Sequence, residues 1–150
     1  MAEKLRVARL YWLLLAIVTV GRWVQGAIGK PYEEGHHIFS IVILTAISTI
    51  YYGAFTRRWR GYRLMQAVTL TFMMGVVSQL VILLSTIASY GFGLETYFNH
   101  PRALNSAVPL AFGPALIVRL GGLLGNSIFA GIGGALGWAL GALLPERQTH

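Results

Sequence analysis

The stretch GGLLGNSIFAGIGGALGWALGALL, residues 121 to 144, decides what kind of fold this chain can form. It contains no charged residue over a length that, as a helix, crosses about 30 Å of membrane hydrocarbon. Gly133, Gly137 and Gly141 recur every four residues within it, which places them on one helix face. A glycine face lets a second helix approach closely, so the sequence predicts a tightly packed transmembrane helix. Its partner is either another helix of the same bundle or a second copy of the chain.

The composition of the whole chain is that of a membrane protein. Of its 150 residues, 55% are hydrophobic and only 11% are charged, whereas soluble domains carry about 25% charged residues. Apolar runs of about 20 residues or more recur along the sequence, and this is the length that a membrane-crossing helix needs. We therefore expect an all-α integral membrane protein that forms a single helical-bundle domain over residues 1–150.

Four transmembrane helices are predicted, the last of them rich in glycine. They cover residues 10–29, 38–56, 64–90 and 114–144. Lys30-Pro31 ends the first, because proline lacks an N–H and disfavours a helical residue before it. Pro114 falls in the first turn of the fourth, where proline is tolerated. Residues 93–113 are expected to form a partly buried loop or half-helix. A five-helix alternative places a turn at residues 119–122.

The N-terminal stretch imitates a signal peptide, with a basic segment before an apolar one. The apolar run continues to Gly29 without a small-x-small cleavage site, which favours a retained transmembrane helix.

The distribution of lysine and arginine predicts the orientation of the helices. With a cytoplasmic N-terminus, that side collects Lys4, Arg6, Arg9, Arg57, Arg58, Arg60 and Arg63. The opposite side holds Lys30 and Arg102. Because cytoplasmic loops are enriched in Lys and Arg, we expect a multi-pass protein with its N-terminus in the cytoplasm. The net charge of +7 has the same origin, and no basic patch beside a soluble fold indicates nucleic-acid binding.

The cluster RRWRGYR, residues 57–63, combines arginines with aromatic residues at a predicted membrane boundary. This combination is typical of a belt that binds anionic lipid headgroups. Membrane lipids are therefore expected partners.

Two of the predicted helices carry polar stripes that lipid cannot satisfy. The stripe of the second contains His37, Ser40, Thr45, Ser48, Tyr51 and Tyr52. The stripe of the third contains Thr71, Gly75, Ser78, Gln79, Ser85, Thr86 and Ser89. They indicate either interhelical hydrogen bonds or a polar cavity between the second and third helices. Gln79, which cannot satisfy its amide within its own helix, favours the cavity.

The remaining polar residues gather on the side opposite the N-terminus. They are Arg22, Glu33, Glu34, His36, His37, Glu95, His100, Arg102 and Arg119. One interpretation is a set of ion pairs in which the three arginines bind the glutamates and tie loops to helix ends. A second is a site where guanidinium groups bind an anion or a lipid headgroup.

A third interpretation is a metal site, because imidazole and carboxylate groups suit zinc or a similar ion. Its candidate ligands are Glu33, Glu34, His36, His37 and His100. Adjacent histidines on a helix point about 100° apart, and the spacing lacks the i, i+4 pair of zinc helices, so this site is the weakest of the three.

Motifs of known catalytic sites are absent from the sequence. There is no phosphate-binding glycine loop, no G-x-S-x-G turn, no dinucleotide fingerprint and no cysteine. The sequence therefore favours no cofactor and gives no support for an enzyme.

Three functional hypotheses follow from these patterns. The first is a membrane protein, oligomeric through its glycine face, that binds or transports a small or amphiphilic anionic ligand. Its binding residues would be Arg22, His37, Gln79, His100, Arg102 and Arg119. The second is a non-catalytic accessory subunit of a larger membrane complex. The third is a metal-dependent membrane enzyme that acts on lipid.

Overall fold

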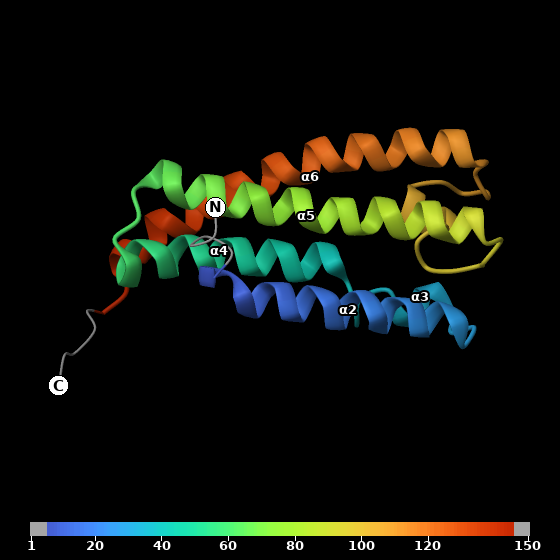
Figure 1. The fold of residues 1–150 in the computed structure, drawn as a ribbon, viewed down its shortest axis with the longest axis horizontal. Helices are drawn as coiled ribbons and strands as arrows, with labels where there is room; N and C mark the ends of the chain where they lie inside the picture. Colours follow the sequence, from blue (N-terminus) through green and yellow to red (C-terminus); the bar gives the residue numbers. More distant parts are fainter. Residues whose placement is uncertain (1–5, 146–150) are drawn as a thin grey trace.

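The computed structural model describes residues 6–145, and these residues form helices joined by turns and loops. Four long helices run alternately in opposite directions along the long axis of the molecule (Figure 1). They are α2 (Arg9–Ala27), α4 (Ile41–Arg60), α5 (Leu64–Gly91) and α6 (Phe112–Leu140). Short helices follow α2, precede α6 and follow α6, namely α3 (Tyr32–Gly35), η1 (Pro101–Leu104) and η2 (Gly141–Leu143).

Three of these segments are long and apolar enough to cross a membrane: α2, α5, and α6 together with η2. The fourth long helix, α4, is less apolar, because it has three arginines in its last turn and contains several polar residues. Thr45, Ser48, Thr49 and Thr56 are among these, and all four are buried. All four helices expose large apolar side chains, for example Leu13, Ile47, Leu84 and Leu124. An apolar surface of this extent is typical of contact with lipid or with another protein.

The beginning of α4 differs from the prediction, which placed residue 38 in the helix. Ser40 is the N-cap, and its hydroxyl accepts a hydrogen bond from the backbone N–H of Ile43 over 3.3 Å. Residues 36–39 therefore form a turn, and His37 is not part of the polar face of α4. The helix also continues beyond residue 56 to Arg60, where Gly61 ends it with a left-handed φ of 64°.

Residues 112–140 form one continuous helix, so the alternative with a turn at 119–122 is wrong. Pro114 is the third residue of α6, where its missing N–H has no intrahelical partner to lose. The connection between α5 and α6 contains η1 and is partly buried, with Tyr97, Phe98 and Leu104 almost inaccessible to solvent.

The glycine face of α6 packs against α4 of the same chain. A Cβ on Gly133 would lie 2.6 Å from the hydroxyl of Thr49, and one on Gly141 would lie 2.8 Å from the carbonyl oxygen of Ala54. A Cβ on Gly137 would overlap the carbonyl oxygen of Ile50. Glycine is required at position 137 because the backbones of α6 and α4 touch at this point. By contrast, Gly125 has nothing within 4 Å of its Cβ position.

The polar stripe of α5 is buried in full, whereas that of α4 is only partly buried. Tyr51, predicted in the stripe, is 53% exposed. Most of the buried hydroxyls bond to carbonyls of their own helix; Thr45, for example, donates to Ile41 over 2.7 Å and Ser78 to Gly75 over 2.8 Å. This local pairing is common for Ser and Thr in helices.

Candidate functional site

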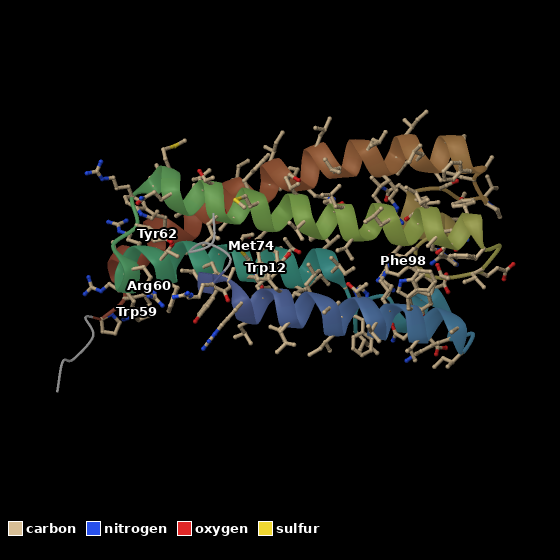
Figure 2. All side chains as sticks on the ribbon, viewed as in Figure 1. Trp12, Trp59, Arg60, Tyr62, Met74 and Phe98 are labelled. Atoms are coloured by element: carbon tan, nitrogen blue, oxygen red, sulfur yellow. The ribbon has the colours of Figure 1, made fainter. Side chains whose placement is uncertain are left out.

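The residues with site chemistry lie at the end of the bundle where α2 ends, α4 begins, α5 ends and α6 begins (Figure 1). The 57–63 segment lies at the other end. Figure 2 shows Trp59, Arg60 and Tyr62 of this segment at one end of the bundle and Phe98 toward the other. The 57–63 segment and the candidate site therefore lie at opposite ends of the bundle.

A cavity of about 340 Å³ occupies this end of the bundle. Its polar lining consists of Arg22, Tyr32, His36, Ser40, Gln79, Arg102, Asn105, Arg119 and Asn126. Its apolar lining includes Ile41, Val42, Ile82, Phe98 and Val118. The described residues of this lining include three arginines and no acidic side chain. The cavity is therefore cationic.

Arg119 comes from the second turn of α6 and is held by loop and helix oxygens. Its Nη2 donates to the carbonyl of Phe98 over 2.6 Å, its Nη1 to Ala103 over 3.1 Å, and its Nε to the hydroxyl of Thr86 over 3.0 Å. These bonds fix the guanidinium in place. They use three of its five N–H donors, so two are left for a ligand.

Arg22 enters the cavity from the last third of α2. Its Nη1 donates weakly, over 3.4 Å, to the carbonyls of His36 and Phe39. Its guanidinium carbon lies 5.5 Å from the ring centre of Phe98 and 5.6 Å from that of Tyr97. Arg22 and Arg119 line the same cavity, so two positive charges face one space. An anion bound there would offset their mutual repulsion.

The prediction that the arginines pair with glutamates is wrong for Arg22 and Arg119. Their contacts are carbonyl oxygens, a hydroxyl and aromatic rings. Arg102 does pair with Glu33, over 3.2 Å, at the surface, where the two side chains are 66% and 49% exposed. The pKa of Glu33 is lowered, first by a hydrogen bond from its own backbone N–H and then by the charge of Arg102.

Two amide side chains stand at the inner end of the cavity. Gln79 of α5 is only 5% exposed. Its Oε1 and the Nδ2 of Asn126 lie 3.6 and 3.7 Å from where a Cβ on Gly122 would be. Within residues 6–145, neither amide makes a hydrogen bond to another residue. Both amides line the cavity and can hydrogen-bond to a ligand there, so this end of the cavity suits a polar or charged ligand.

His36 and His100 stack on Tyr32, and His37 lies next to His36. The ring of Tyr32 stacks on His100 at 4.4 Å and on His36 at 5.0 Å between centres. The ring centres of His36 and His37 are 3.5 Å apart, and the side chain of His37 is exposed. Partial burial lowers the pKa of His100, which favours its neutral form.

The metal candidates do not come together as a ligand set. Within residues 6–145, no group of three or more His, Asp or Glu side chains is arranged to hold a metal ion. Stacking turns the imidazole faces of His36 and His100 toward Tyr32 rather than directing two ring nitrogens at one point.

The structure brings together Arg22, Gln79, Arg102 and Arg119 of the six predicted binding residues. His37 and His100 do not line the cavity, because the turn before α4 and the stacking on Tyr32 hold them elsewhere. The cavity is also lined by residues of α2, α3, η1 and α6, so it is not a seam between α4 and α5 alone.

Sequence reasoning missed Asn126, an amide within the uncharged stretch 121–144 of a transmembrane helix, and this position was the available signal. It also missed Phe98, for which no local pattern exists.

Comparison of the chain with family models, with curated proteins and with solved structures gave no match.

Proposed function

We propose that this chain is a multi-pass membrane protein, with its N-terminus in the cytoplasm, that binds a small anionic ligand on the opposite side of the membrane. The observation that carries the proposal is the convergence of Arg22 and Arg119 on one cavity whose described lining contains no acid; Arg102, which is paired with Glu33, also lines it. Guanidinium groups bind carboxylate and phosphate through charge-assisted hydrogen bonds. A volume of about 340 Å³ is at the lower end of the range for small-molecule sites.

Binding is better supported than passage through the bundle. Below the amides the helices close, because Gly133 of α6 meets Thr49 of α4 and Gly134 meets Thr71 of α5. The glycine face is also used within the chain, so tight packing of the bundle does not require a second copy. We therefore propose a site with one polar opening.

The test is ligand binding by purified protein in a non-ionic detergent. Isothermal titration with butyl phosphate and with butyrate measures affinity for the two anion types, and butyltrimethylammonium serves as the cationic control. We expect an anion to bind and the cation not to bind. Replacing Arg22 with Gln should weaken anion binding at least about tenfold, which corresponds to one charged hydrogen bond.

The matched control is Arg60→Gln, which removes the same charge from an exposed site at the other end of the bundle. It should leave anion affinity unchanged. The proposal fails if neither anion binds, or if the two substitutions weaken binding equally. Stoichiometric co-purification of foreign membrane subunits, without anion binding, would instead favour the accessory-subunit hypothesis.

A further inference from the structure

Helices α4 and α6 form two walls of the cavity. They are in contact at the arginine-rich end of the bundle and apart at the cavity end. Gly137 meets the backbone of Ile50 near the arginine-rich end. At the other end, the start of α6 lies away from the start of α4 (Figure 1). A second space lies between these helices next to the cavity.

This space is a slot of about 80 Å³, bounded by α4, α5 and α6. Its lining is Val42, Thr45, Ala46, Ser78, Gln79, Asn126, Phe129 and Ala130. Val42, Gln79 and Asn126 also line the larger cavity, so the slot is adjacent to it.

The slot faces the apolar perimeter of the bundle. Val42 and Phe129, on its two edges, are 47% and 70% exposed. The hydroxyls of Thr45 and Ser78 donate to the carbonyls of Ile41 and Gly75. Beyond the two amides, the slot therefore presents mainly apolar surface, in line with the exposed apolar residues around it.

We infer that the ligand is a single-chain anionic lipid, whose headgroup binds the arginines and whose acyl chain lies in the slot between α4 and α6. This inference rests on the proposed function and specifies its ligand. The slot holds at most part of one acyl chain, since its volume is only about 80 Å³. From Asn126 to Gly133, where the slot closes, a helix rises about 10 Å, enough for part of one chain.

The test compares butyl phosphate with dodecyl phosphate on the full chain in a non-ionic detergent. Both carry the same headgroup, and each methylene transferred from water is worth about fourfold in affinity. Dodecyl phosphate should therefore bind at least about tenfold more tightly. Detergent micelles also attract the longer chain. The deciding measurement is therefore how much of the affinity gain of dodecyl phosphate over butyl phosphate is lost when a residue of the slot is substituted.

Ala46→Phe fills the slot from α4, and Ala16→Phe adds the same ring to the apolar groove between α2 and α5. We expect Ala46→Phe to abolish most of the chain-length advantage while butyl phosphate binds as before. Ala16→Phe should preserve the advantage. A circular dichroism spectrum and a melting temperature close to those of the parent chain show that both variants fold.

The inference is overturned if dodecyl phosphate gains nothing over butyl phosphate, or if Ala46→Phe leaves the gain intact. It is also overturned if Ala16→Phe alone removes the gain, because the chain would then lie between α2 and α5. In each of these cases butyl phosphate still binds and the proposed function stands. If neither phosphate binds, this inference fails, and the proposed function fails with it only if butyrate does not bind either.

Discussion

Replacing Gly137 with alanine tests the tightest helix contact in the bundle. The new Cβ would overlap the carbonyl oxygen of Ile50 and would lie 2.7 Å from its carbonyl carbon and 2.9 Å from its Cα. All three are backbone atoms of α4, so no side-chain rotation can make room. The two helices must move apart, which also disturbs the neighbouring contact of Gly133 with Thr49.

The size of the effect follows from two opposing terms. Adding a methyl group to a well-packed interior costs about 1–3 kcal/mol, and the rigid backbone of Ile50 places this site at the upper end. Alanine returns up to about 1 kcal/mol through its higher helix propensity. We therefore expect Gly137→Ala to lower the free energy of unfolding by about 2 kcal/mol.

Gly125→Ala is the matched control on the same helix. Nothing lies within 4 Å of its Cβ position, so only the propensity term applies, and this variant should be unchanged or more stable by up to about 1 kcal/mol. Unfolding in mixed micelles with a rising fraction of sodium dodecyl sulfate, followed by circular dichroism, measures both variants. The reasoning is refuted if Gly137→Ala is as stable as the parent chain, or if Gly125→Ala loses as much stability.

Three further predictions concern the loops around the cavity. Arg119→Met removes the guanidinium that donates to the carbonyls of Phe98 and Ala103. Although the hydroxyl of Thr86 still donates to Phe98 over 3.2 Å, the same micelle titration should show a loss of about 1–3 kcal/mol. Tyr97→Phe removes the hydroxyl that donates to the carbonyl of Lys30 over 2.9 Å, and the expected loss is about 1 kcal/mol. The folded-state pKa of His100 is below its ordinary value of 6.5, so the unfolded chain binds the proton first and stability falls as the pH drops below about 6.5. His100→Gln should reduce this loss when unfolding is compared at pH 7.5 and pH 5.5, and an identical pH dependence in both proteins would contradict it.

The presence and position of the helices could largely be predicted from the sequence, because they depend on local properties. The length of the apolar runs located α2, α5 and α6, and Pro31 and Pro114 lie just outside or just inside helix ends as their missing N–H requires. The four-residue spacing of Gly133, Gly137 and Gly141 indicated a face for close packing whatever its partner. Each of these signals acts within a few turns of chain.

The partners of those faces were decided only by the tertiary structure. The glycine face could equally have packed on another protomer, and its contact with Ile50 joins residues 87 positions apart in the numbering. Arg119 could have bound a glutamate; the loop after α5 instead brings the carbonyls of Phe98 and Ala103 to it. The cavity exists because α4 and α6 touch at one end and diverge at the other. A sequence records which side chains each helix carries, but the angle between two helices depends on contacts summed along both, and no local spacing contains that sum.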